Sequence, residues 1–420
     1  MNNNNFINNR EKLFERICDN SLVVMFAGIE KHKTADQYFD FEPNRNFFYL
    51  TGISRDNMVL VMRKGEKNET YLFIEENTEL KAKWDGARMS KEEASELSGI
   101  EVKNIRYLEA FDNFFQAMMG VSRLGSKPAE FLHLDILRSK GNEHQETFEF
   151  SRKVKDLYPE LQVKNVNIEL GYLRMFKSDA EVEEIQKAVD FTNEGILNLM
   201  RNAEPGLYEY QIESFYKQSL MFNNTTESFQ TIAASGVNAT TLHYVDNNAK
   251  VEDNTLCLFD LGSISNNYCS DITRTFPANG KFTDRQRAIY EIVLKANKES
   301  INYVKPGVTW TEINKFAKDI LIKGLKDLGI IKEDSEISKY YYHGLGHFLG
   351  LDVHDVGIYS EPLSEGMVLT IEPGLYIAEE KIGIRIEDDI LVTKDGFVNL
   401  SADIIKEVHD IEEFMQNKTL

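Results

Sequence analysis

Two acidic hairpins and a group of histidines supply the side chains that could do chemistry in this sequence of 420 residues. In the first hairpin, two β-rich runs flank a cluster of Ser and Asn, and the turn is expected between Ser265 and Asn266. Asp260 and Asp271 are equally far from that centre, so they would lie directly opposite each other, with Cβ atoms about 4.5–5.5 Å apart. Two carboxylates this close repel each other unless they share a proton or a cation. Taken alone, the hairpin fits equally well two Asp residues that face solvent at strand ends.

The same geometry recurs further along the chain. A turn at residues 379–380 would place Glu372 opposite Glu387. Strand alternation would then put Arg385 on the same face as Glu387. Pro373 cannot donate to a strand ladder, so the pairing beside Glu372 must be irregular. One acidic hairpin is a weak signal, whereas two are a much stronger one.

Four of the eight histidines are candidates, and they fall in the same half of the sequence as the hairpins: His243, His343, His347 and His354. His343 and His347 stand four apart, as on a metal-binding helix. Two glycines lie between them, which favours a tight glycine loop over a helix. A lone histidine is more often structural than a ligand, but a cluster beside paired acids reverses that expectation.

The acids and histidines together predict a metal site. Four carboxylates and about one imidazole form a hard, oxygen-rich ligand set, which suits Mn²⁺, Co²⁺, Fe²⁺ or Zn²⁺ better than a thiolate zinc site would. Two metals roughly 3.5–4 Å apart can hold a hydroxide between them and polarise a carbonyl. The chemistry expected is therefore hydrolysis.

An internal repeat positions these hairpins. Two Pro-Gly pairs, each followed by three apolar residues, recur 101 positions apart. They are Pro205-Gly206 with Ile212, Phe215 and Leu220, and Pro306-Gly307 with Ile313, Phe316 and Leu321. Each half should run long helix, Pro-Gly turn, second helix, then strands. Residues 173–420 are therefore predicted to form an α+β domain of two similar halves, whose shared cleft is the natural place for a site.

Residues 1–172 are predicted to form a separate α/β domain. Short apolar runs indicate strands at 21–26, 47–50, 58–62 and 70–74, and helices are expected at 91–97 and 111–119. Nothing in this part has ligand spacing. A chain of this length exceeds what one hydrophobic core usually serves, which fits a division near residue 172.

Composition excludes several classes of function. The net charge of −20 would repel a phosphate backbone or an anionic membrane, so neither nucleic acid nor membrane is an expected partner. The sequence has neither an apolar signal core at its start nor a stretch near the roughly 20 apolar residues that span a bilayer. The three cysteines are too few and too scattered for a disulfide framework, which fits a soluble protein of a reducing cytoplasm.

These residues resemble the motifs of the pita-bread metallopeptidases, and within them of aminopeptidase P (Xaa-Pro aminopeptidase). The resemblance covers essentially the whole chain, as a creatinase-like N-terminal domain followed by a pita-bread domain. It rests on residues 242–244, 271–276, 343–357, 371–374 and 383–389. Prolidase carries similar strings, so the motifs separate the two activities less well. The family usually has Gly where this chain has Asn267, and because Asn tolerates left-handed backbone the same turn is expected.

The resemblance implies a role for each metal ligand. Asp271 and Glu387 would bridge two metal ions, and Asp260 would chelate one of them. His347 and Glu372 would complete the other. Mn²⁺ is the first expectation, with Co²⁺, Fe²⁺ or Zn²⁺ as alternatives.

The resemblance also implies roles towards the substrate. Glu372 would shuttle the proton of the bridging water. His243 and His354 would contact the substrate and the developing oxyanion, and His343 would border the pocket for the proline ring. Arg385 would hold neighbouring carboxylates or the substrate.

Three functions stay open at this point. The first is an aminopeptidase that hydrolyses the N-terminal Xaa-Pro bond of peptides through a metal-bridging hydroxide. The second is a prolidase restricted to Xaa-Pro dipeptides. The third is a metal-free binding protein of the same fold, which the presence of all five ligands disfavours. A homodimer or homotetramer formed through the N-terminal domain is implied by the resemblance alone.

Overall fold

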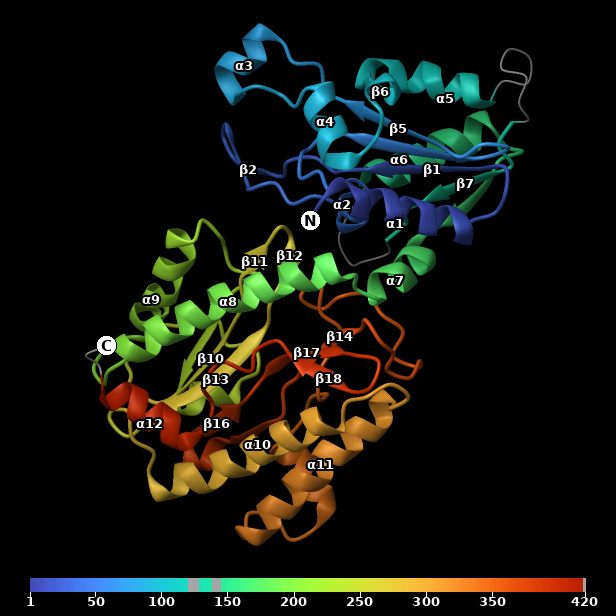
Figure 1. The fold of residues 1–420 in the computed structure, drawn as a ribbon. Helices are drawn as coiled ribbons and strands as arrows, with labels where there is room; N and C mark the ends of the chain where they lie inside the picture. Colours follow the sequence, from blue (N-terminus) through green and yellow to red (C-terminus); the bar gives the residue numbers. More distant parts are fainter. Residues whose placement is uncertain (120–127, 138–144, 418–420) are drawn as a thin grey trace. The chain divides into compact units, whose positions relative to one another are not determined.

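The computed structural model describes residues 1–119, 128–137 and 145–417. It divides into two compact units, Met1–Arg174 and Met175–Leu420, each of which is described by itself (Figure 1). Within the described ranges, no helix combines the length and the apolar character that crossing a bilayer requires.

A six-stranded mixed sheet in the order β6-β5-β4-β1-β7-β8 forms the centre of the first unit. Its strands are β1 (Ser21–Phe26), β4 (Val59–Lys64), β5 (Glu69–Ile74), β6 (Ile105–Tyr107), β7 (Phe131–Leu134) and β8 (Gln162–Asn165). A short ribbon pairs β2 (His32–Thr34) with β3 (Gln37–Tyr38). The helices are α1 (Asn3–Arg16), α2 (Arg45–Thr51), α3 (Glu79–Asp85), α4 (Lys91–Ser98), α5 (Phe111–Met119), α6 (Gln145–Leu157) and α7 (Asn167–Met175). Phe73, Phe111 and Phe150 belong to the buried core of this unit. The predicted α/β class is confirmed, with helices at the two predicted places.

The apolar run at residues 47–50 was predicted to be a strand, and this prediction is wrong, because the run lies in helix α2. The Asn44 side chain begins the helix by accepting hydrogen bonds from the N–H groups of Asn46 and Phe47. Gly52 ends it in the left-handed region at a φ of 70°. Four apolar residues have no period that separates a strand from a buried helix, so the two caps decide.

The second unit confirms the predicted repeat. Its helices are α8 (Asp179–Asn202), α9 (Glu209–Phe222), α10 (Asp284–Tyr303), α11 (Trp310–Asp327) and α12 (Val408–Gln416). The ends of α8 and α10 are 101 positions apart, as are the starts of α9 and α11. Gly206 and Gly307 make the turns between them with φ values of 100° and 90°, which an L side chain rarely adopts.

The strands of the second unit lie between α8 on one side and α10 with α11 on the other (Figure 1). One sheet has the order β13-β10-β9 and another the order β14-β17-β18, while β11 pairs with β12 and β15 with β16. Their bounds are β9 (Ile232–Ser235), β10 (Leu256–Leu261), β11 (Ile264–Ser265), β12 (Tyr268–Cys269), β13 (Ile272–Pro277), β14 (Val368–Ile371), β15 (Gly374–Ile377), β16 (Ile382–Arg385), β17 (Asp388–Val392) and β18 (Phe397–Asn399). This α+β arrangement holds both acidic hairpins.

Candidate metal centre

In the first acidic hairpin, the turn lies one residue later in the sequence than predicted, so the strands pair in a different register. Asp260 pairs with Thr273, so its predicted direct opposition to Asp271 is wrong. The turn is made by Asn266 and Asn267, both left-handed with φ values of 46° and 68°. Two such residues form the tight turn that matches the twist of a hairpin. The left-handed conformation expected of Asn267 is thus confirmed, and Asp271 becomes a diagonal neighbour of Asp260.

The register predicted for the second hairpin is confirmed. Strands β14 and β17 pair in the same register as β15 and β16, and in that register Glu372 lies opposite Glu387. Both residues fall in the gap between the two ladders. The predicted irregularity beside Pro373 is present, since this residue cannot donate to a ladder. The interruption leaves both carboxylates beside a cavity.

One cavity of about 250 Å³ collects every candidate site residue. They are His243, Asp260, Asp271, His343, His347, His354, Glu372, Arg385 and Glu387, and Leu242, Gly344 and Gly346 complete the wall. Residues 343–347 form no helix, as the two glycines predicted. Both repeat halves contribute to this cavity.

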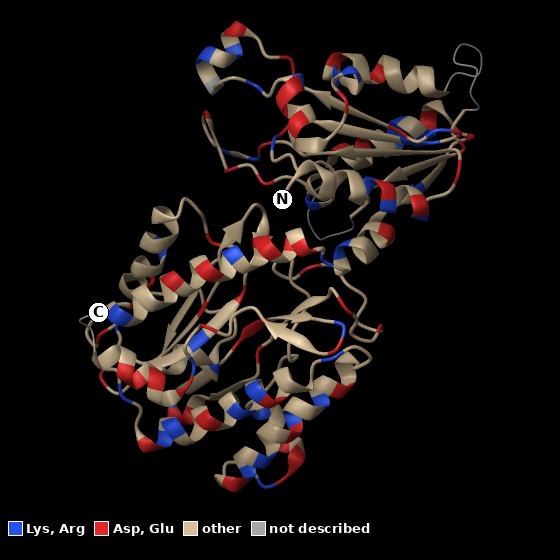
Figure 2. Cartoon of the chain, in the orientation of Figure 1, with Lys and Arg blue, Asp and Glu red and all other residues tan. Residues whose placement is uncertain are grey.

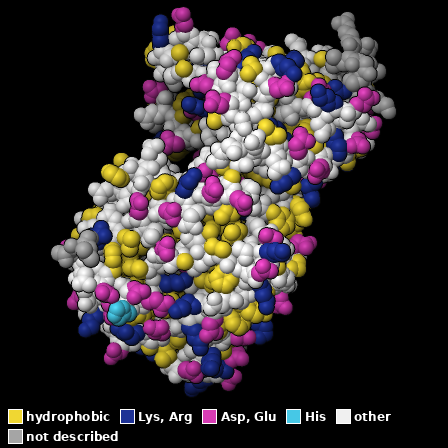
Figure 3. Space-filling model, in the orientation of Figure 1, with side chains coloured by type: hydrophobic (Ala, Val, Ile, Leu, Met, Phe, Trp, Pro, Cys, Tyr) yellow, Lys and Arg dark blue, Asp and Glu magenta, His cyan; other side chains and the backbone are white. Residues whose placement is uncertain are grey.

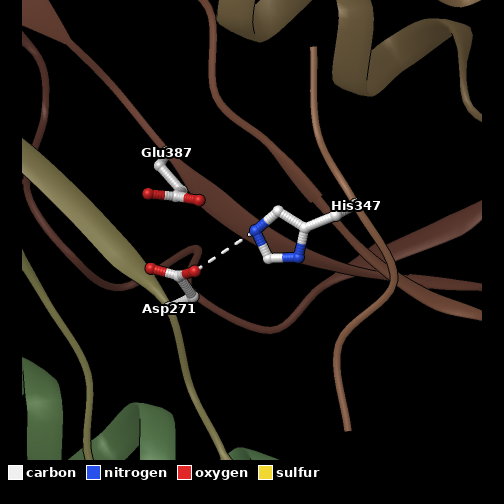
Figure 4. Close-up of side chains that lie close together, drawn as sticks. All are labelled: Asp271, His347 and Glu387. Carbon is white, nitrogen blue, oxygen red and sulfur yellow. Dashed lines mark ion pairs between the residues drawn. The ribbon is translucent and has the colours of Figure 1, made fainter. Parts of the chain in front are cut away.

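Asp271, His347 and Glu387 form the tightest group in it (Figure 4). Each offers one ligand atom, and these atoms lie within 4.8 Å of one another. His347 Nε2 lies 3.3 Å from Asp271 Oδ2 and 3.6 Å from Glu372 Oε1. His347 Nδ1 lies 3.0 Å from the carbonyl oxygen of Phe348, which suits donation by an Nδ1–H. That tautomer turns the Nε2 lone pair towards the carboxylates.

The carboxylates of the cavity are buried and lie close to one another, as expected of ligands that share divalent cations. Burial, and then the charge of Asp260, raises the pKa of Asp271 well above its usual range. Burial, and then the charge of Asp271, does the same for the pKa of Glu387. Burial raises the pKa of Glu372 to about 7. Among the described residues, Asp260 Oδ1 and Asp271 Oδ1 are buried without a hydrogen-bond partner. Divalent cations would satisfy these oxygens and relieve the repulsion.

Arg385 orders the acids from one side. Its guanidinium donates to Asp260 Oδ2 at 2.6 Å, to the Tyr376 hydroxyl at 3.1 Å and to Thr273 Oγ1 at 3.0 Å. Thr273 in turn donates to Glu387 Oε2 at 2.6 Å. Burial would lower the pKa of Arg385, but Tyr376 and the surrounding acids hold it well above its usual value. Thr273 and Tyr376 were not among the predicted site residues, although strand alternation from Asp271 and Glu372 points to both.

Two histidines of the cavity are neutral. His343 donates from Nδ1 to the Gly344 carbonyl at 2.7 Å, and its Nε2 accepts from the Tyr376 hydroxyl at 2.8 Å. Burial lowers the pKa of His343 to about 4. Burial, and then His347, lowers the pKa of His354 to about 4, and these two rings lie 4.0 Å apart between centroids. Neutral imidazoles can donate or accept beside a metal centre without adding positive charge.

Two family models match the chain. The model of metallopeptidase family M24 matches residues 183–394, and the model of the aminopeptidase P N-terminal domain matches residues 6–124. The first covers the whole cavity wall. The two matches fall in the second and first units respectively.

Known proteins resemble the chain over its full length. A Xaa-Pro aminopeptidase from Escherichia coli is 33% identical over 98% of this chain and 97% of its own. A solved structure of a candidate aminopeptidase P from Bacillus anthracis is 44% identical, covers all of both chains and superposes with a TM-score of 0.96. A structure of E. coli aminopeptidase P with the inhibitor Pro-Leu is 31% identical and covers 100% of this chain and 99% of its own, with a TM-score of 0.89.

Proposed function

The chain belongs to metallopeptidase family M24, among its Xaa-Pro aminopeptidases, and is a hydrolase; we propose that it removes the N-terminal residue of peptides whose second residue is proline. The observation that carries this proposal is the single cavity that brings five candidate ligands and three histidines of the recognised motifs together. The N-terminal domain is proposed to be structural, and to join subunits into a dimer or tetramer. Sedimentation of the purified protein tests that part.

Membership of a metallopeptidase family implies divalent metal ions. We propose that Asp271 and Glu387 would be ligands of both ions, that Asp260 would be a ligand of one, and that His347 and Glu372 would be ligands of the other. Mn²⁺ is the proposed metal, because the donor set is rich in carboxylate oxygen. When bound, such a pair supplies a nucleophile at neutral pH and polarises the scissile carbonyl. Elemental analysis of the purified protein tests the number and identity of the ions.

The remaining side chains are proposed to bind, orient and move protons. Glu372 would carry a proton from the attacking water towards the leaving nitrogen, because its carboxylate lines the cavity beside the proposed metal ligands. His354 donates to the oxygen of the scissile carbonyl as negative charge develops there. His243 contacts the substrate from the opposite half of the repeat. Arg385 keeps Asp260 in place through its hydrogen bond.

A site that selects proline must bind the ring of the second residue without using a backbone N–H. The nitrogen of an X–Pro bond carries no proton, so a pocket that accepts an N–H at this position gains nothing from proline. The ring must be held by apolar and imidazole surfaces instead. The His343 ring packs against Tyr341 and Tyr376 with centroid distances of 4.8 and 5.5 Å, which provides such a surface.

A comparison of kcat/KM for Xaa-Pro-Ala, Xaa-Ala-Ala and Xaa-Pro tests the proposal. Xaa-Pro-Ala should be cleaved far faster than Xaa-Ala-Ala, and the tripeptide should be at least as good a substrate as the dipeptide. Cleavage of Xaa-Pro alone would point to a prolidase. If the enzyme instead prefers peptides with alanine in the second position, the proposed role of His343 in binding proline is wrong.

A further inference from the structure

The loop that carries His243 depends on other elements for its position. Residues 241–249, called the His243 loop below, form neither helix nor strand. His243 itself is exposed and reaches the wall of the cavity. A segment without ladder hydrogen bonds depends on contacts with side chains for its position. For the His243 loop, the carboxylate of Glu209, which lies outside the cavity wall, makes two such hydrogen bonds.

Glu209, the first residue of α9, is 1% exposed and accepts five hydrogen bonds. Oε1 accepts from the N–H and hydroxyl of Ser235, each at 2.7 Å, and from Asn238 Nδ2 at 3.2 Å. Oε2 accepts from the Tyr244 hydroxyl and the Ala249 N–H, both at 2.9 Å. The carboxylate therefore ties the His243 loop, beside His243 and at its far end, to the residues that precede the loop. Hydrogen bonds to a charged acceptor are among the strongest a protein makes.

The His243 loop caps α9 in return. The first N–H groups of a helix have no partner within it. Here Glu209 N–H donates to the Ala249 carbonyl at 3.0 Å, and Tyr210 N–H donates to the Asn247 carbonyl at 2.8 Å. One turn later, Glu213 accepts from Asn247 Nδ2 at 2.9 Å. The loop and the first turn of α9 thus fix each other.

The second half of the repeat uses the equivalent helix position in the same way. Asn314 in α11 lies 101 positions after Glu213. Its Oδ1 accepts from the N–H of Leu345 at 2.8 Å, in the loop between His343 and His347. The second turns of the two repeat-related helices therefore both contact histidine-bearing loops.

We propose that Glu209 is a positioning residue, which fixes His243 for contact with the peptide substrate by clamping the His243 loop. This rests on the proposed function, in which His243 contacts the substrate. In the described part of the chain, Glu209 does not line the cavity, so it acts through the loop. A displacement of about 1 Å in a positioning group can cost about 10²-fold in rate.

The first test is Glu209→Gln in the metal-loaded enzyme. In one orientation the amide NH₂ faces the donors Tyr244 and Ala249, and in the other it faces Ser235, so at least one backbone N–H loses its acceptor. We expect kcat/KM for Xaa-Pro-Ala to fall by about 10- to 100-fold while the metal content is unchanged. Amide hydrogen exchange of the His243 loop should become faster. Unchanged exchange and unchanged kcat/KM would overturn the proposal.

Glu181→Gln is a matched control. Glu181 is also a buried glutamate in the first turn of a helix, and it accepts from the Ser178 N–H at 2.8 Å and from the Tyr268 hydroxyl at 2.9 Å. It lies in α8 and contacts no part of the His243 loop in these hydrogen bonds. Its variant should keep kcat/KM and the exchange rate of that loop. An equal loss of kcat/KM in both variants would show a general effect on stability and overturn the proposal.

A double-mutant cycle with His243→Ala shows whether Glu209 acts through His243. In the His243→Ala background, Glu209→Gln should change kcat/KM by less than about 2-fold. A loss as large as in the wild type would overturn the proposal.

If Glu209→Gln does not fold, Ser235→Ala can replace it. This variant removes a single hydroxyl donor to Glu209 and should show a smaller loss of kcat/KM with the same dependence on His243. A wild-type kcat/KM in His243→Ala alone would instead refute the proposed role of His243, so the two failures are distinct.

Discussion

Asp271 is the residue on which the charges of the cavity converge. It is buried, it belongs to the tight group with His347 and Glu387, and Asp260, Asp389 and Glu372 all raise its pKa after burial has done so. A single carboxylate that faces so many acids needs a counter-charge in the folded protein. That requirement makes it the most informative residue to remove.

Asp271→Ala should lower kcat/KM by more than about 10²-fold, because it removes a proposed ligand of both metal ions. The metal content measured by elemental analysis should fall as well. Asp395→Ala, which removes an exposed aspartate of the same unit, is the control and should change neither quantity. Two tightly held ions with near-normal turnover in Asp271→Ala would contradict the ligand assignment.

His354→Ala should separate catalysis from metal binding. If His354 steadies the oxyanion, turnover should fall by about 10²–10³-fold while both ions are retained. The His354 ring lies against that of His347, so a metal-content assay is needed beside the rate. Release of metal in this variant would mean that the roles of His347 and His354 are exchanged.

At the scale of the elements, strand alternation predicted more of the site than local turn chemistry did. The Glu372–Glu387 hairpin has its predicted register, because counting from a turn fixes which residues face each other. The Asp260–Asp271 hairpin has a register different from the predicted one, because the turn is formed by two left-handed asparagines one residue later than expected. Alternation kept both acids on one face, so they still reach one cavity.

Strand alternation places Tyr376 on the face of Glu372, but the side-chain contacts of Tyr376 and Glu209 could not be predicted from local patterns. Tyr376 reaches His343 only because the segment before the glycine loop lies against β15, where the Tyr376 N–H donates to the Tyr340 carbonyl, and Glu209 reaches its loop only because that loop returns to cap α9. Both contacts join segments that are distant in the sequence. Periodicity describes one element at a time, so contacts of this kind need the assembled fold.

A buried ion pair holds the loop that carries His354, and it gives a prediction about stability. Lys177 Nζ lies 3.1 Å from Asp355 Oδ2, and both side chains are 1% exposed. Lys177→Met should lower the free energy of unfolding by about 3–5 kcal/mol, because it leaves a buried carboxylate without its cation. Urea denaturation measures this. Lys295→Met, which breaks an exposed pair with Glu299, should cost less than about 0.5 kcal/mol. Equal effects of the two variants would contradict the prediction.

Across the whole molecule, the acidic excess is spread widely, apart from the carboxylates of the cavity. Asp and Glu are scattered over the helices of both units (Figure 2), and acidic and basic side chains are interspersed on the face shown in Figure 3. Exposed charges of this kind interact weakly through water. The buried carboxylates are the ones that can make the stability of the whole chain depend on cations and on pH.

The pH dependence of the metal-free protein follows from three of these carboxylates. Burial raises the pKa of Glu372 to about 7, and it raises those of Asp271 and Glu387 well above their usual range. In the unfolded chain these groups titrate near pH 4. The folded state therefore holds protons that the unfolded state has released, and this stabilising effect is lost as the pH rises through the folded-state pKa values.

The free energy of unfolding of the metal-free protein should thus fall between about pH 6.5 and 8, by up to about 1.4 kcal/mol per pH unit for each group that titrates there. Below about pH 6.5 the trend is opposed by His343 and His354, whose lowered pKa values make the folded state harder to protonate than the unfolded chain.

Divalent cations take the place of the protons on these carboxylates, so Mn²⁺ should raise the Tm and flatten its pH dependence. Thermal scans with chelator and with Mn²⁺ at pH 6.5 and 8 measure both effects. A metal-free Tm that rises over this interval would show that these carboxylates are already ionised in the folded protein.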